Sequence, residues 1–241
     1  MGAEQVIIQE LIAGQNTYQP SAETKQLLAD KTLIMLVGAT CMGKSTVMYE
    51  TMRQNPDIRV VGTRTTRNPR SDDDRSRYTY RPNTTDGLRS ILTDVQRQSF
   101  VQYAVNPHND TVYWSEPSDY DSTVCIGDYF SDVVESFKTY GFRVIMPMTV
   151  ITDPHSWQQR LDERFPPHDS RRPERLREAM DSLHWSLGQP DGHPFIVNQQ
   201  HESHTAAASV ISAIHGEVAP YGTGKALAAA CLALAERLCQ S

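Results

Sequence analysis

The alternation of apolar and polar positions predicts an α/β protein. Residues 32–37 (TLIMLV) form an uninterrupted apolar run that ends at a glycine. Such a run is typical of a strand buried on both faces, as in a parallel sheet. Residues 44–54 have helical composition, so strand, glycine-rich loop and helix make one βα unit. We expect a three-layer fold, in which a parallel sheet carries helices on both faces.

The same patterns predict the remaining elements. Further strands are expected at 58–63, 78–81, 100–105, 111–114, 123–126, 142–150 and 195–197. Helices are expected at 4–13, 21–30, 87–97, 130–140, 154–164, 172–186, 202–215 and 223–240. The polar, charged stretch 64–77 is expected to be a loop. The amphipathic helix at 223–240 could pack on its own domain or form a homodimer through the terminal helices.

Composition narrows the classes of partner. The chain has a net charge of -6, with 39% hydrophobic and 22% charged residues. A broad attraction to nucleic acid or to an anionic membrane is therefore not expected. There is no apolar run of about 18 residues, which a membrane span would need. The four cysteines form no CxxC pair, which favours reduced thiols and a cytoplasmic location.

One motif carries chemistry directly. Residues 38–45 match G-x-x-x-x-G-K-[ST], the phosphate-binding loop or P-loop. Its glycines let backbone N–H groups point at phosphate oxygens, and the following helix directs its positive end at the same anion. Lys44 would reach the β and γ phosphates, and Ser45 would lie near Mg²⁺. The expected ATP-binding residues in this stretch are Gly38, Ala39, Thr40, Cys41, Met42, Gly43, Lys44, Ser45 and Thr46.

A P-loop indicates a nucleotide but no particular reaction. A second cluster follows at residues 63–70, which read Thr-Arg-Thr-Thr-Arg-Asn-Pro-Arg. Arg67 and Arg70, with neighbouring hydroxyl groups, could form a bidentate phosphate clamp. A solvated charged loop explains the same composition equally well.

The stretch 65–70 (TTRNPR), followed by Tyr78, resembles the monophosphate-binding signature of the guanylate kinase family. Residues 100–104 (FVQYA), 113–115 (YWS) and 195–198 (FIVN) resemble further segments of that family, over about 32–216. The resemblance implies that Asn198 lies near the donor base. It implies an acceptor site of Thr63, Arg67, Arg70, Tyr78, Gln102, Tyr113, Ser115 and Asp128.

The resemblance extends to a helical lid. Arg160, Arg164 and Arg175 reproduce the family's arginine spacing and, with Lys44 and Arg67, would be the catalytic residues. They would neutralise the charge on the transferring phosphoryl group. Arg171 and Arg172 are interpreted as surface charge.

The implied fold is of the P-loop NTPase type, with a small mixed β acceptor-binding lobe and a helical lid. Domain boundaries follow from it. We expect helical extensions at 1–30 and 217–241 and a guanylate kinase-like domain at 31–216. That domain divides into a core (31–62 and 116–216), an acceptor lobe (63–115) and a lid (154–175).

Three positions depart from the family's pattern. Gln102 replaces a glutamate that reads the base, and an amide offers one acceptor and one donor where a carboxylate offers two acceptors. Asp128 is the one acid at the position of an acidic D-x-D stretch, and residues 71–77 lack the usual glycines. Groups that handle phosphate are thus present, whereas groups that read the base are altered.

The resulting hypothesis is phosphoryl transfer from ATP, with Mg²⁺, to a nucleoside monophosphate, with GMP or dGMP as the leading acceptors. Two alternatives stay open. One is a kinase for another phosphorylated small molecule or a modified nucleotide. The other is a guanylate kinase-like binding module with weak or no catalysis.

Overall fold

The computed structural model describes residues 2–69, 77–106, 109–217 and 221–240. The chain divides into two compact units. The four-strand unit comprises Met1–Thr32, Arg59–Cys125 and Glu135–Ile145. The P-loop unit comprises Leu33–Ile58, Ile126–Val134 and Met146–Ser241.

A five-stranded parallel sheet, the greater part of which belongs to the P-loop unit, has the strand order β2-β7-β1-β8-β9. Its strands are β1 (Thr32–Val37), β2 (Ile58–Val60), β7 (Val124–Asp128), β8 (Val144–Ile151) and β9 (Phe195–Val197). All six residues of the central strand β1 are buried, as its apolar run predicts. In a parallel sheet the strands end at one edge, so the segments that follow β1, β7, β8 and β9 gather there.

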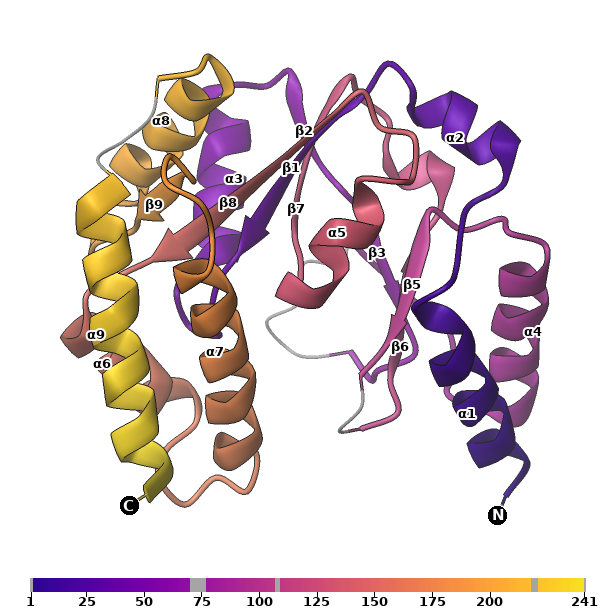
Figure 1. Cartoon of the computed structure of the whole chain (residues 1–241). Coiled ribbons are helices and arrows are strands. Elements are labelled where there is room, and N and C mark those ends of the chain that lie inside the picture. Colours follow the sequence, from indigo (N-terminus) through magenta and orange to yellow (C-terminus); the bar gives the residue numbers. More distant parts are fainter. Residues whose placement is uncertain (1, 70–76, 107–108, 218–220, 241) are drawn as a thin grey trace. The chain divides into compact units, whose positions relative to one another are not determined.

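Helices flank this sheet, which confirms the expected α/β architecture (Figure 1). They are α3 (Lys44–Gln54), α6 (Pro154–Arg164), α7 (Arg172–Leu187), α8 (Ser203–Ile214) and α9 (Tyr221–Gln240). Helix α3 packs on α8, and α7 packs on α9.

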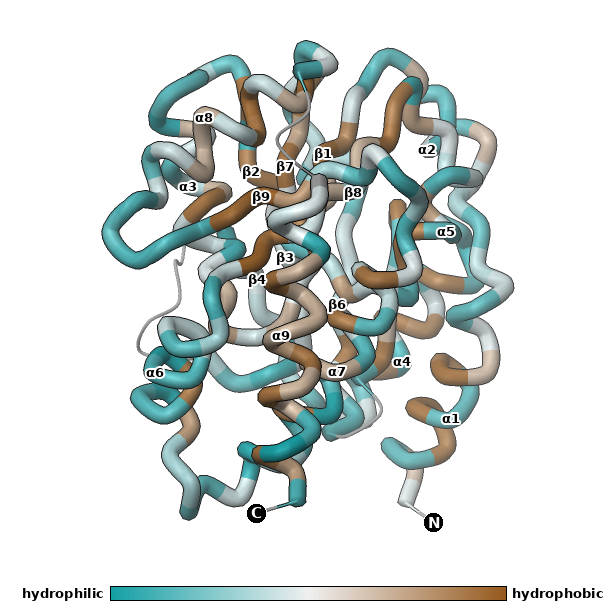
Figure 2. The backbone as a smooth tube through the Cα atoms, turned by 60° about the vertical axis from the view of Figure 1, so that its left-hand side comes forward, coloured by the Kyte–Doolittle hydropathy of each residue, from teal (hydrophilic) through white to brown (hydrophobic). Residues whose placement is uncertain are grey.

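The apolar face of the amphipathic helix α9 is buried within its own unit. Ala228, Cys231, Leu234 and Ala235 are covered, and Gly224 lies so close to Phe195 of β9 that a Cβ would clash. Figure 2 shows the resulting alternation of hydrophobic and hydrophilic turns along α9. The helix begins at Tyr221, two residues earlier than expected.

The four-strand unit holds a mixed sheet in the order β4-β3-β6-β5. Its strands are β3 (Thr63–Thr65), β4 (Tyr78–Tyr80), β5 (Gln102–Val105) and β6 (Val112–Ser115). Strand β3 is parallel to β4 and antiparallel to β6, and β5 is antiparallel to β6. The expectation of a loop from residue 64 is therefore wrong for β3. Its three polar residues carry no apolar alternation, and the two neighbouring strands supply its pairing.

The core of this unit lies between one face of the mixed sheet and two helices, α1 (Ala3–Gln15) and α4 (Thr85–Gln96). Figure 1 shows α1 alongside α4. The core residues are Ile7, Ile8, Leu11, Tyr18, Leu88, Ile91, Phe100, Tyr103, Val105, Val112 and Trp114. The N-terminal helix is thus part of the unit's interior. A second N-terminal helix, α2 (Ala22–Leu28), follows it.

Three short elements complete the chain: the 3₁₀ helices η1 (Pro117–Asp119) and η2 (Ser131–Val133), and α5 (Val134–Phe137). A helix was expected over 130–140, but the α-helix here spans only Val134–Phe137, so the predicted length is wrong. Lys138, Thr139 and Tyr140 each donate a backbone hydrogen bond three residues back, so the chain tightens into turns before Gly141. Among the helices in the described ranges, none is long and apolar enough to span a membrane.

Candidate functional site

The P-loop connects the end of β1 to the start of α3 in a backbone conformation that needs glycine. Gly38 has φ of +148° and Gly43 has φ of +87°. A Cβ on Gly38 would clash with the carbonyl oxygen of Val150 on β8. Gly43 is also the N-cap of α3 and offers no side-chain cap. The first N–H groups of α3 therefore lack a side-chain partner there, which is the arrangement that binds an anion.

Lys44 lies across this loop. Its Nζ donates to the carbonyl oxygens of Gly38, at 2.7 Å, and Ala39, at 3.1 Å. Burial lowers the pKa of Lys44, while the negative charges of Asp128 and Glu178 oppose that shift. The ammonium group is thus held at the phosphate site by acceptors that a phosphate oxygen can replace. The next two residues, Ser45 and Thr46, are exposed on the first turn of α3.

Two buried side chains support the loop from other elements. The indole Nε1 of Trp157, on α6, donates to the carbonyl of Thr40 at 2.8 Å. The amide Nδ2 of Asn198, which follows β9, donates to the carbonyl of Met42 at 2.9 Å. The resemblance placed Asn198 near the donor base; in the structure its amide nitrogen holds the P-loop.

Cys41 occupies the turn of the loop, with φ of +64°. Burial raises the pKa of its thiol, and the nearby Thr40 hydroxyl and the charges of Arg164 and Lys44 oppose that shift. The interaction with Cys41 places the guanidinium of Arg164, at the end of α6, beside the P-loop.

The other two predicted lid arginines have different surroundings. Nη1 of Arg160, on α6, would lie 3.5 Å from a Cβ on Gly43. Within the described part of the chain, Arg160 makes no hydrogen bond or ion pair. Arg175, on α7, is paired with Glu178 at 2.6 Å and with Glu174 at 3.4 Å. Arg160 and Arg164 are therefore at the P-loop, and Arg175 is held by carboxylates.

Arg172 corrects an expectation. Read as surface charge from the sequence, it is only 7% exposed. Its Nη1 pairs with Asp162 at 2.7 Å and also donates to the carbonyl of Phe165. It thus joins the end of α6 to the start of α7, and a polar sequence context gave no sign of that burial. Arg171 is exposed, as expected, and pairs with Asp169 at 2.6 Å.

Asp128 is the last residue of β7, the strand beside β1. Its negative charge acts on Lys44, opposing the fall in the pKa of that lysine. The resemblance assigned Asp128 to the acceptor. Its influence on Lys44 places it near the P-loop of its own unit.

The register of the mixed sheet assigns side chains to its two faces. Directly paired residues share a face, and neighbours along a strand alternate. Tyr103, Val105, Val112 and Trp114 face the core. The open face, on the other side, consists of Thr63, Thr65, Tyr78, Tyr80, Gln102, Ala104, Tyr113 and Ser115. It contains five of the predicted acceptor residues: Thr63, Tyr78, Gln102, Tyr113 and Ser115. The predicted Arg70 lies outside the described residues.

Arg67 follows β3 and is stacked on this face. Its guanidinium lies 4.7 Å from the ring centre of Tyr78 and 5.5 Å from that of Tyr80. Arg77 lies 5.1 Å from the ring of Tyr78. Cation–π contacts of this kind hold a guanidinium in a fixed orientation. Arg77 and Tyr80 were missed from the sequence, although the alternation Arg77-Tyr78-Thr79-Tyr80 signals a strand with one aromatic face.

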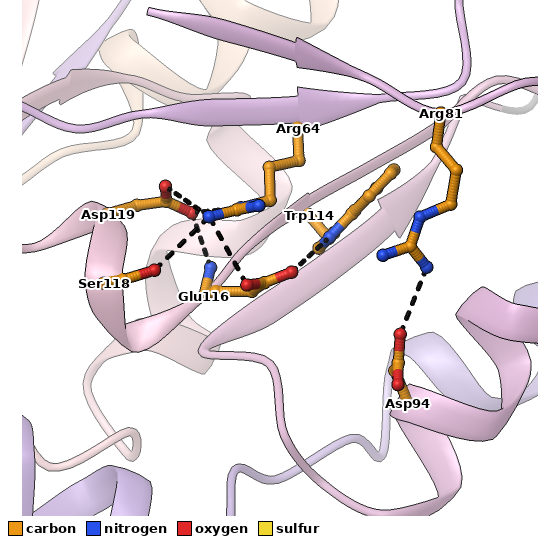
Figure 3. Close-up of polar contacts among 7 residues, drawn as sticks. All are labelled: Arg64, Arg81, Asp94, Trp114, Glu116, Ser118 and Asp119. Atoms are coloured by element: carbon orange, nitrogen blue, oxygen red, sulfur yellow. Dashed lines mark hydrogen bonds and ion pairs between the residues drawn. The ribbon is translucent and has the colours of Figure 1, made fainter.

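Arg64 is paired with Trp114 across the strands and therefore lies on the opposite face; Figure 3 shows its polar contacts. It pairs with Asp119 at 2.9 Å and with Glu116 at 3.4 Å. Glu116 also accepts a bond from Nε1 of Trp114 at 3.4 Å. Two carboxylates thus hold Arg64 in a structural position, and it is not part of the open face.

Gln102 presents an unsatisfied group on the open face. Its Oε1 atom is buried and has no hydrogen-bond partner among the residues that the structure describes. The hydroxyl of Ser115, paired with Gln102 across the strands, lies 2.9 Å from the hydroxyl of Tyr120 and is engaged there. Buried acceptors are rarely left unpaired in folded proteins, so this oxygen is suited to a ligand.

Comparisons with known proteins add a family and a group of similar solved structures. One of these structures is guanylate kinase from Anaplasma phagocytophilum, at 11% identity and a TM-score of 0.49, with 79% of this chain and 86% of that chain covered. No curated protein matches the chain. A family described as an AAA domain matches residues 33–184, from β1 through most of α7. This match covers more than half of the chain, and the protein therefore belongs to the AAA domain family.

Proposed function

We propose that the protein transfers a phosphoryl group from ATP to a nucleoside monophosphate. The observation that carries this proposal is the set of cations at the P-loop. Among the residues that the structure describes, Lys44 donates only to loop carbonyls and Arg160 lies beside Gly43 without a partner, while Arg164 lies beside Cys41. Simple nucleotide binding needs the loop and its lysine. Additional guanidinium groups suit a reaction in which charge on phosphate oxygens must be neutralised.

The donor half of the reaction uses the P-loop unit. The N–H groups at the start of α3 would bind the β phosphate, with the ammonium of Lys44 moving from its carbonyl acceptors to the phosphate oxygens. Arg160 and Arg164 would then lie against the γ-phosphoryl group. Phosphoryl transfer asks little covalent chemistry of the protein, so positioning and charge neutralisation account for most of the rate.

The residues near Lys44 fit Mg²⁺ bound together with ATP. Ser45 exposes a hydroxyl on the first turn of α3, and Asp128 supplies a carboxylate whose charge acts on Lys44. The ion prefers oxygen ligands and is commonly held by one or two protein groups together with phosphates and water. The described residues contain no cluster of three or more metal-binding side chains, so the phosphates would supply the other ligands. Bound there, Mg²⁺ would neutralise charge on the phosphates.

The acceptor half uses the open face of the four-strand unit. Arg67, fixed by the rings of Tyr78 and Tyr80, supplies a cation for the acceptor's phosphate. The hydroxyl of Thr63 and the amide of Gln102 supply neutral polar groups on the same face. A phosphate clamp beside uncharged polar groups suits a nucleoside monophosphate.

The test is turnover with a panel of monophosphates: GMP, dGMP, AMP, CMP, UMP and IMP. ATP and magnesium are supplied, and ADP release is followed. We expect ADP release that depends on an added monophosphate, with the matching diphosphate as second product. Binding of ATP without transfer to any member of the panel would contradict the proposal.

Lys44→Ala tests the donor site. We expect loss of at least about a thousandfold in kcat, because the variant lacks the cation closest to the phosphates. Lys138→Ala is the matched control, since Lys138 is an exposed lysine whose ammonium group pairs with Glu135 on α5. Equal activity of the two variants would remove Lys44 from the reaction.

A further inference from the structure

The side chain of Gln102 is positioned to read a ligand. It lies at the start of β5, next to residues that two bonds tie to the N-terminal helix. The hydroxyl of Tyr103 donates to the carbonyl of Leu11 at 2.9 Å, and the backbone N–H of Val105 donates to Oε1 of Gln15 at 2.8 Å. Strand β5 is therefore held firmly, and its first side chain has a defined place on the open face.

The chemistry of an amide limits what Gln102 can recognise. Its Oε1 accepts and its Nε2 donates, side by side. Neither atom makes a hydrogen bond with the described residues, and Oε1 is buried. The complement is a planar group with one N–H donor beside one acceptor. Guanine and hypoxanthine both offer such a pair at N1–H and O6.

The 2-amino group of guanine is a different matter. Together with N1–H it forms two adjacent donors, and these need two adjacent acceptors, as in a carboxylate. A single amide oxygen does not provide them. The neighbouring hydroxyl of Ser115 is engaged with Tyr120. No carboxylate residue belongs to the open face as the strand register defines it within the described residues.

We propose that Gln102 reads the acceptor's base through one donor–acceptor pair and leaves the 2-amino group of guanine unread. The acceptors are then nucleoside monophosphates whose base offers an N–H donor beside an acceptor, with hypoxanthine accepted as readily as guanine. This inference rests on the proposed function only in taking the acceptor to be a nucleoside monophosphate.

The experiment is equilibrium binding to the full chain, measured by calorimetry, with three probes: GMP, IMP and ribose 5-phosphate. Ribose 5-phosphate has the phosphate and sugar but no base. For the unchanged protein we expect GMP and IMP to bind within about threefold of each other. Both should bind at least about tenfold more tightly than ribose 5-phosphate, because of one good pair of hydrogen bonds.

Gln102→Glu supplies the second acceptor. We expect it to raise the preference for GMP over IMP by at least about tenfold, because the carboxylate makes a charge-assisted bond to the 2-amino group. Gln102→Ala should bring GMP and IMP close to ribose 5-phosphate. The affinity for ribose 5-phosphate should stay constant in both variants, which shows that they are folded. Gln26→Glu, at an exposed position of α2, is the control for added negative charge.

The outcomes separate this inference from the proposed function. A preference of the unchanged protein for GMP over IMP beyond about tenfold would overturn the inference, because the 2-amino group would then be read. An unchanged GMP to IMP ratio in Gln102→Glu would also overturn it. Base-selective binding without phosphoryl transfer would leave the inference standing and refute the kinase. Phosphoryl transfer that does not depend on Gln102 would support the kinase and refute the inference.

Discussion

Trp157 on α6 and Thr40 in the P-loop are joined by a hydrogen bond of 2.8 Å, from the indole Nε1 to the backbone carbonyl. The indole is fully buried, so the bond is shielded from water. Helix α6 also carries Arg160 and Arg164. The conformation of the loop and the position of these two arginines are therefore linked through one side chain.

Trp157→Phe removes the donor and keeps most of the ring. We expect the free energy of unfolding to fall by about 1–3 kcal/mol, as for a buried hydrogen bond whose partner is left unsatisfied. ATP affinity should fall several-fold because the loop is less well ordered. Urea denaturation and ATP titration measure the two effects. Trp185→Phe is the control, because no hydrogen bond of the Trp185 indole is present in the described chain. ATP affinity equal to that of the unchanged protein would break the link between Trp157 and the loop.

Gly43→Ala tests the close approach of Asn198 to the loop. A Cβ on Gly43 would clash with the amide nitrogen of Asn198, and φ of +87° is strained for alanine. Gly192→Ala separates these causes, because Gly192 has φ of +91° and open space around its Cβ position. We expect both variants to lose about 1–2 kcal/mol of stability from the backbone conformation. Only Gly43→Ala should abolish ATP binding in titration calorimetry. Retained ATP binding would show that the loop accommodates the methyl group.

His193 gives the P-loop unit a dependence on pH. It is buried, its Nε2 lies 2.9 Å from the hydroxyl of Thr149, and burial lowers its pKa to about 4. An unfolded histidine has a pKa near 6.5, so between these values the unfolded chain binds a proton that the folded chain does not. This contribution to stability is therefore complete above pH 6.5 and is lost as the pH falls towards 4.

We expect the loss to be about 2 kcal/mol across that window, after allowing for partial solvation of the ring. His193→Gln should remove this part of the pH dependence, even though it lowers stability at every pH. The free energy of unfolding, measured in urea at half-unit steps from pH 7 to pH 4, gives both slopes. His155→Gln, at an exposed histidine, is the matched control. A slope that His193→Gln leaves unaltered would assign the effect to other groups.

Leu11 tests whether the N-terminal helix belongs to the core of the four-strand unit. It is fully buried against that core. Leu11→Ala should therefore cost about 2–5 kcal/mol of stability. Val6→Ala, on the same helix at 49% exposure, should change stability by less than about 0.5 kcal/mol. Thermal and urea unfolding compare the two. Equal effects would mean that the helix packs loosely.

Elements whose signal is local were predicted well. The strand at Thr32–Val37 and the helix at Lys44–Gln54 agree with expectation to the residue, because an apolar run and a glycine-rich loop define their ends. Helix α6 agrees as well, because Asp153 caps it and Pro154 occupies its first position.

Features that depend on residues far apart in the sequence could not be predicted from local patterns. Thr63–Thr65 became a strand through partners 15 to 50 residues away. Arg172 is buried because Asp162 and the carbonyl of Phe165 meet it there. That Oε1 of Gln102 has no hydrogen-bond partner among the described residues follows only from the three-dimensional structure, in which the neighbouring Ser115 hydroxyl bonds to Tyr120. The grouping of the predicted acceptor residues on one face likewise required the register of the strands.

The packing of α1 against β5 has a consequence for the chain during its synthesis. The carbonyl of Leu11 receives its bond from Tyr103, which lies 92 residues later. At a synthesis rate of about 5–20 residues per second, the helix waits roughly 5–20 seconds for that strand. A helix of 13 residues is marginal by itself in water. During this interval Ile7, Ile8 and Leu11 have no β5 to cover them. The nascent chain thus passes through a stage at which the residues of α1 are largely unfolded and expose apolar side chains. A translational pause before β5 would lengthen the exposure of these residues to chaperones and proteases.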